Sequence, residues 1–309
     1  LFVAPGPRPR DAMANAREDA DAPPVDETVF ADRNGLAVDA LCWYHAYTDD
    51  DRAATYARRA RDHVCATLVE AGADHGDHLG RVAHFDPAAA PADGAPAPTG
   101  LLVDQARLLQ GLTSSWQVLG EPGPARPVAD WTLANRRGGA GAGTVGAGDE
   151  AATGAFTDGP AEGPGLCSEV LWPLEGNVET ADAFLDLALL TGRDEYRTAA
   201  EGAVAAFGEA AERMGVEVAG YATAVARCRE PVAIEVGAPA GSDLHRAALR
   251  LADHEAVVVP AADRDDDHDA GAFERDDPPA SGEALRRVDG TVAGRASDPS
   301  GLEELLTAR

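Results

Sequence analysis

The chain has 309 residues with 53 acidic and 26 basic side chains, a net charge of -27 at pH 7, and all 26 basic residues are arginine. Without lysine the protein can form neither a lysine Schiff base nor a lysine-dependent phosphate-binding loop. The charge excludes binding to a phosphate backbone, and the lack of an apolar run of about 18 residues predicts no membrane span.

The first predicted element is a helical hairpin over residues 34–72. Apolar residues recur at helical spacing from Asn34 to Tyr47. The acidic turn 49–51 is typical of a cap for a second helix, which Gly72 would end.

The same pattern occurs twice more, over residues 100–137 and 176–215. The segment 138–165 between them is rich in Gly and Ala, so we expect a loop with little to bury. Three helix pairs joined by long loops predict a mainly α fold, an α/α toroid of which about half is present, over residues 1–228.

Residues 229–309 have a different pattern. Residues 231–238, 241–252 and 254–261 are expected to form a strand, a helix and a parallel strand. An acidic loop follows at 263–277, then an edge strand near 290–297 and a last helix. The sequence therefore predicts a small α/β element after the helical part.

Several segments resemble the YyaL-like thioredoxin-domain proteins (the spermatogenesis-associated family), in the family's own order. They are "AREDADAPPVDETVFADRNGLAVDAL", "GLLVDQARLLQGL", "EGNVETADAFLDLALLTGRDEYRTAAE" and "PVAIEVGAP". The resemblance covers only that family's C-terminal half. It implies a six-hairpin glycosidase-like toroid, related to sugar 2-epimerases, that follows a thioredoxin-like domain. This chain has Thr28 and Arg33 where the family has Lys and Trp.

Five polar residues are candidates for a pocket in such a toroid: Asp32, Asn34, Asp104, Glu175 and Asn177. The two aspartates precede or open helices, and two carboxylates facing one pit could act as acid and base on a sugar. Helix capping or solvation explains each of the five as well, and it is favoured for Asp32, Asn34 and Asp104. For the Asn34-Gly35 pair, glycine would also allow a close backbone approach.

No metal and no cofactor are expected. His75 and His78 lie close together in "DHGDH", but neither a helix nor a strand presents them. The four cysteines form no CxxC pair and are interpreted as small buried residues in a reducing compartment. The acidic, lysine-free composition is typical of halophilic proteins, so we expect a cytoplasmic location in a salt-rich cell.

The sequence leaves three functions open. The chain could supply part of a carbohydrate-type pocket whose activity is unknown or lost, or it could be a sugar epimerase or glycoside hydrolase. It could also be a non-catalytic scaffold that docks a separate thioredoxin-bearing partner or self-associates through an exposed apolar face. The start at Leu1 indicates a fragment or a processed chain.

Overall fold

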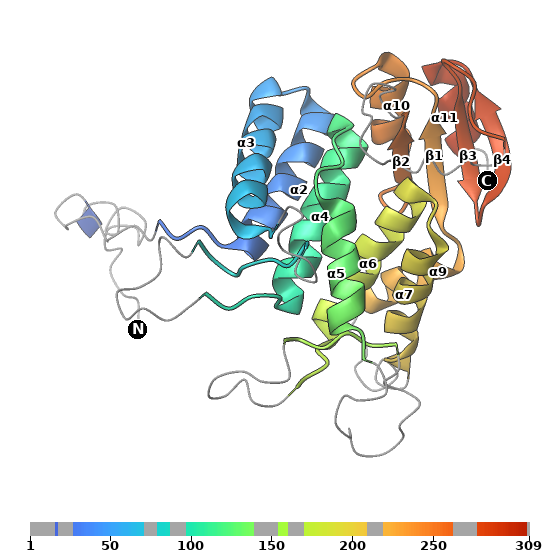
Figure 1. Ribbon diagram of the computed structural model, residues 1–309. Coiled ribbons are helices and arrows are strands. Elements are labelled where there is room, and N and C mark those ends of the chain that lie inside the picture. The colour runs from blue at the N-terminus through green and yellow to red at the C-terminus, as the bar shows by residue number, and fades with distance from the viewer. Residues whose placement is uncertain are drawn as a thin grey trace, which may run out of the picture.

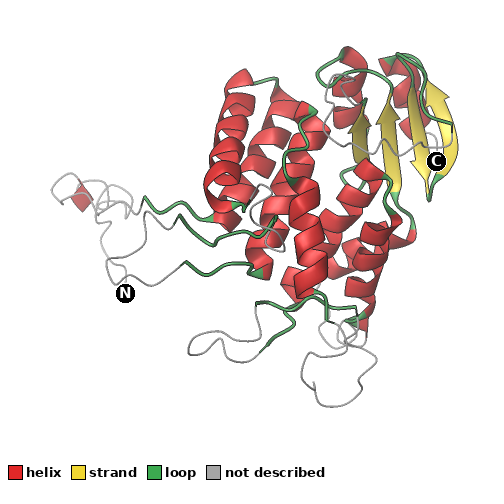
Figure 2. Cartoon of the chain, viewed as in Figure 1, coloured by secondary structure: helices red, strands yellow, loops and turns green. Residues whose placement is uncertain are grey.

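The structure is a computed structural model, mainly helical with one small sheet near the C-terminus (Figure 2). It describes residues 16–17, 27–70, 79–86, 97–138, 154–159, 170–208, 219–261 and 277–307. Its main elements are α2 (Ala31–Thr48), α3 (Asp51–Leu68), α4 (Leu102–Leu119), α5 (Ala125–Arg136), α6 (Leu174–Thr191), α7 (Asp194–Ala205), α9 (Ala219–Arg229), β1 (Val232–Val236), α10 (Asp243–Leu251), β2 (Val257–Pro260), β3 (Ala284–Val288), β4 (Thr291–Ala296) and α11 (Pro299–Thr307).

Three antiparallel helical hairpins form an arc. The first helices of the pairs, α2, α4 and α6, lie side by side, and α3, α5 and α7 return beside them (Figure 1). Among the described helices, none combines the length and apolar character needed to cross a membrane. The arc is the arrangement of half an α/α toroid, so the predicted fold class is confirmed.

Local turn residues set several of the helix ends that the sequence predicted, but α3 ends at Leu68 with Val69 as its C-cap, before the predicted Gly72. The Asp50 side chain accepts a hydrogen bond from the Arg52 backbone N–H at 2.9 Å and so caps α3. Gly120 and Gly192, with φ of 77° and 72°, end α4 and α6 in the left-handed region. The hairpins therefore follow from local turn residues.

Helices α2 and α4 cross at two glycines. A Cβ on Gly35 would lie 2.4 Å from the backbone oxygen of Arg107, and one on Gly111 would lie 2.5 Å from the oxygen of Gly35. The predicted close backbone approach at Gly35 is thus confirmed. Asn34 is not the N-cap, because α2 begins at Ala31; its Nδ2 donates to the Phe30 carbonyl at 2.8 Å within the first turn.

The C-terminal sheet has the strand order β2-β1-β3-β4. Strands β1 and β2 are parallel and are connected through α10, and β4 lies at an edge; all three features were predicted. Strand β3 was missed, although it pairs antiparallel with β1 and with β4. Ile234 and Val258 of the sheet pack against Val38 and Cys42 of α2 and Val118 of α4.

Two further differences from the sequence reading concern the helical part. Helix α9, which packs against α6 and α7, was not predicted. Phe156 lies in the segment expected to bury little, yet it is fully buried and contacts Phe184 with ring centroids 5.4 Å apart. The segment 138–165 is described only at 138 and 154–159, and residues 263–276 of the acidic loop lie outside the described residues.

The three described cysteines are free thiols that pack in the interior. Burial raises the pKa of Cys42 to about 12 and the pKa values of Cys65 and Cys228 to about 11. A thiol with so high a pKa is a poor nucleophile near neutral pH, so these residues act as small core side chains.

Candidate functional site

The first turns of the three inner helices each carry an acidic candidate residue. Asp32 opens α2, Asp104 opens α4 and Glu175 opens α6. Carboxylates are favourable there because the N-terminus of a helix carries partial positive charge. Arg107 connects two of them, with nitrogen–oxygen distances of 3.3 Å to Asp32 and 4.0 Å to Glu175, and it also pairs with Glu179.

Asp104 is fully buried and is paired with a histidine that sequence reasoning missed. The Nδ1 of His84 lies 3.0 Å from both carboxylate oxygens of Asp104. Burial raises the pKa of Asp104, and the hydrogen bond from His84 partly opposes that rise. The His84 ring stands edge-on to Phe30 and Phe85, with centroids 5.2 and 5.8 Å away.

Asp32 joins this pair to form what we call the Asp–His cluster: Asp32, His84 and Asp104. One potential ligand atom from each lies within 4.8 Å of the others. The Asp32 Oδ1 atom is buried and finds no hydrogen-bond partner among the described residues. These three side chains could therefore hold a metal ion.

Asn34 and Asn177 have structural roles. Asn177 is 1% exposed; its Oδ1 accepts from the Phe156 backbone N–H at 2.6 Å, and its Nδ2 donates to the Phe156 carbonyl at 2.9 Å. Asn34 bonds within its own helix turn. Both amides are thus engaged by backbone groups, but neither residue is the N-cap of its helix, because Phe30 and Pro173 hold those positions.

A larger polar cavity, which we call the inner groove, lies along α2, α4 and α6. It encloses about 540 Å³. Its lining consists of Leu36, Asp39, Trp43, Tyr47, Gln110, Ser114, Gln117, Glu179, Asp182, Ala183, Asp186, Arg227, His254 and Ala256. Glu179, which belongs to this lining, accepts hydrogen bonds from Arg107 and so connects the groove to the Asp–His cluster.

Two carboxyl groups of the groove have raised pKa values. Burial raises the pKa of Asp39, although Ser114 Oγ donates to its Oδ1 at 2.5 Å. Burial also raises the pKa of Asp182 to about 6, even though the Arg227 guanidinium lowers it in part. The groove therefore holds carboxyl groups that titrate closer to neutrality than ordinary aspartates.

Arg227 of α9 lies between two acids of the groove. Its Nη1 donates to Asp182 at 2.9 Å, its Nη2 donates to Asp186, and its Nε donates to the Glu255 carbonyl at 3.2 Å. The side chain is only 11% exposed. This ion pair closes the α6 side of the groove.

The groove acids were not among the sequence candidates. Asp39 follows the apolar "GLAV", and Asp182 and Asp186 are four residues apart in "ADAFLDLAL". An acid inside an otherwise apolar helical stretch was the signal that could have marked them, because such a residue must face a polar partner or a cavity.

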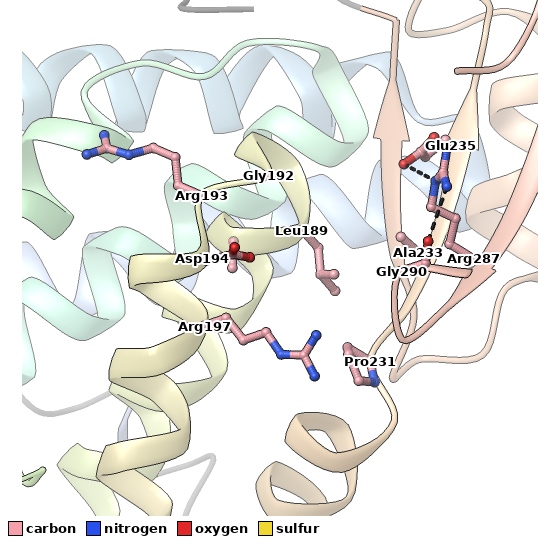
Figure 3. Close-up of a pocket in the computed structure, with 11 residues that line it drawn as sticks. Leu189, Gly192, Arg193, Asp194, Arg197, Pro231, Ala233, Glu235, Arg287 and Gly290 are labelled. Atoms are coloured by element: carbon pink, nitrogen blue, oxygen red, sulfur yellow. Dashed lines mark hydrogen bonds and ion pairs between the residues drawn. The ribbon is translucent and has the colours of Figure 1, made fainter. Parts of the chain in front are cut away.

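A second cavity, of about 270 Å³, separates the α6–α7 turn from the sheet (Figure 3). Two arginines of its lining form ion pairs with acidic side chains. Arg197 pairs with Glu201 and Asp289, and Arg287 donates to Glu235 at 2.9 Å. The Arg197–Asp289 pair joins α7 to the turn between β3 and β4, whereas Arg197–Glu201 lies within α7 and Arg287–Glu235 within the sheet, so these charges have structural roles.

The comparisons with known proteins assign no family to the chain. No family model and no curated protein matches the chain. One similar solved structure is the GH76 alpha-mannanase of Bacteroides thetaiotaomicron, at 15% identity and a TM-score of 0.45, over 62% of this chain and 46% of that chain. The chain thus spans less than half the length of that structure, and a likeness of this size carries no argument. His75 and His78 lie outside the described residues.

Proposed function

We propose that the inner groove binds a neutral carbohydrate. The observation that carries the proposal is the lining itself, in which two aromatic rings stand beside hydrogen-bonding groups. Trp43 and Tyr47 lie one helical turn apart with ring centroids 6.1 Å from each other. Flat aromatic faces pack against the apolar face of a sugar ring, and polar groups nearby fix its hydroxyls.

The charge of the groove favours hydroxyl donors over anions. Asp39, Glu179, Asp182 and Asp186 line it, against the guanidinium of Arg227. Carboxylates accept hydrogen bonds from sugar hydroxyls, but they repel phosphate or carboxylate groups on a ligand. A neutral polyhydroxylated molecule therefore suits the groove best.

Replacing Tyr47 with alanine tests this proposal. We expect Tyr47→Ala to weaken saccharide binding about tenfold, equivalent to ~1.4 kcal/mol, because one stacking face is lost. Binding of neutral mono- and oligosaccharides is measured by tryptophan fluorescence and calorimetry at multimolar salt.

Tyr56 provides the matched control. It is 57% exposed, against 54% for Tyr47, and it lies on α3 outside the groove. Tyr56→Ala should bind like the unchanged protein. Equal losses in the two variants, or no saturable binding by the unchanged protein, would contradict the proposal. Turnover of the bound sugar would support the hydrolase or epimerase version, since Asp182 and Asp39 have the raised pKa values that an acid catalyst uses.

A second candidate function rests on the solvent-exposed apolar residues of α2. Leu36, Tyr44 and Tyr47 are 38%, 54% and 54% exposed, and Ala37 and Ala40 are exposed between them. Together they form an apolar strip on the first helix of the arc. With the resemblance to YyaL-like proteins, this strip supports a scaffold that packs against a separate half bearing the thioredoxin-like domain.

Native purification at multimolar salt tests the scaffold function. We expect the unchanged protein to elute with a thioredoxin-bearing polypeptide, identified by light scattering and mass spectrometry. Tyr44→Glu should abolish that association, because a charge would be buried in the strip, whereas Tyr56→Glu should not. A lone monomer in every case would rule the scaffold out.

A further inference from the structure

We propose that Asp32, His84 and Asp104 bind a divalent transition-metal ion, with Zn²⁺ as the reference ion. The ligand set is one imidazole nitrogen and two carboxylate oxygens. Zinc binds histidine and aspartate at about 2.0–2.2 Å, and three protein ligands with an open position for water are typical of catalytic zinc sites.

The three ligands come from segments that are held together by backbone hydrogen bonds. The Ala31 N–H, next to Asp32, donates to the His84 carbonyl at 2.9 Å, and the His84 N–H donates to the Pro98 carbonyl at 2.8 Å. Asp104 lies in the first turn of α4. The positions of the ligands are thus set by the main chain and do not depend on flexible side chains alone.

The hydrogen bonds of the cluster leave one oxygen for a cation. The Nδ1 of His84 contacts both carboxylate oxygens of Asp104, and Arg107 Nη1 lies 3.3 Å from Asp32 Oδ2. Asp32 Oδ1 is buried and has no partner in the part of the chain that the structure describes. A simple His84–Asp104 hydrogen bond explains two of the three residues, but it leaves this buried carboxylate oxygen unsatisfied, which is costly.

The residues around the Asp–His cluster hold its three side chains in place, as the outer shell of a metal site does. Arg107 fixes Asp32, the Asp32 backbone N–H hydrogen-bonds to Asp104, and the rings of Phe30 and Phe85 fix the plane of His84. Such contacts orient metal ligands and tune affinity. The side chain of His84 is 28% exposed while that of Asp104 is 0% exposed, so an ion would be reached from the His84 side.

The test is metal binding by the full chain after chelator treatment, in multimolar KCl to suppress diffuse binding to the acidic surface. We expect one equivalent of Zn²⁺ by calorimetry, and one equivalent of Co²⁺ with visible absorption bands that Zn²⁺ displaces. His84→Gln should weaken binding about 100-fold or more, and Asp32→Asn about tenfold or more, by analogy with the 10- to 100-fold effects of outer-shell changes.

Control variants distinguish this site from adventitious binding by other histidines. His254→Gln, at a side chain 81% exposed, and the double variant His75→Gln/His78→Gln should bind as the unchanged protein does. Circular dichroism checks that each variant is folded. The proposal is overturned if no stoichiometric ion binds, if folded His84→Gln retains full affinity, or if the ion is lost with His75 and His78. It stands independently of saccharide binding in the groove.

Discussion

Replacing Arg227 with methionine is expected to destabilise the protein by about 3–5 kcal/mol at pH 7, the cost of breaking a buried ion pair from one side. Methionine keeps the apolar stem but removes the guanidinium that bonds Asp182, Asp186 and the Glu255 carbonyl. The carboxylates of Asp186, 15% exposed, and Asp182, 34% exposed, are then left without their cation. Urea denaturation at a fixed salt concentration measures the decrease in the free energy of unfolding.

The loss should depend on pH with a definite sign. Burial already raises the folded-state pKa of Asp182 to about 6, and removal of Arg227 raises it further. A carboxyl whose folded pKa lies above its unfolded value binds protons more tightly when folded, so stability falls as pH rises through that interval. The penalty in Arg227→Met should therefore shrink as pH is lowered from above the raised pKa of the variant to about 6, and it should then stay constant because the unchanged protein protonates Asp182 as well.

Arg229 provides the control on the same helix. It is exposed, and its replacement by methionine should change stability by no more than about 0.5 kcal/mol, as for most surface substitutions. If Arg227→Met and Arg229→Met cost the same, or if the Arg227→Met penalty grows on acidification, the ion pair does not have the assigned role.

Gly35→Ala is expected to cost about 2–3 kcal/mol, within the range for an overpacked interior. The new methyl carbon would lie 2.4, 2.6 and 2.7 Å from backbone atoms of Arg107 and Leu108. Because these are main-chain atoms of α4, the clash can be relieved only by moving one helix away from the other. The same movement would shift Arg107, which connects the Asp–His cluster to the groove.

Two further variants make the result specific. Gly220→Ala in α9 meets only Val178 at 3.9 Å, so it should be neutral or gain up to about 1 kcal/mol of helix propensity. Gly35→Ala/Gly111→Ala should cost less than the sum of the single changes, because both methyl groups act at one crossing. With the single change Gly111→Ala included for that sum, urea midpoints at constant slope measure all five proteins, and a stable Gly35→Ala protein would refute the close packing.

The helical hairpins could be predicted because their information is local. Periodic apolar residues, the Asp50 cap and the glycines after α4 and α6 act within one or two turns. Strand β3 was missed because "ALRRV" is short and carries two arginines, and its strand character depends on pairing with β1. Phe156 was missed because its burial depends on the distant Phe184 and Asn177.

The candidate sites were predictable only in part for the same reason. Asp32 and Asp104 could be inferred from their places at helix starts and Glu175 from the family resemblance, and the structure places all three in the first turns of α2, α4 and α6. His84 lies in a short extended segment, and only the fold brings it beside Asp104. With 53 acidic residues in the chain, composition could not single out Asp39 and Asp182.

Helix α4 is buried along most of its length, including its polar residues. Asp104 at its start belongs to the Asp–His cluster, and Ser114 and Gln117 farther along line the inner groove. Backbone amides in so enclosed a helix exchange with solvent only when the surrounding structure opens cooperatively. Both sites therefore share one slowly exchanging folding unit, whose amides should become accessible to solvent together.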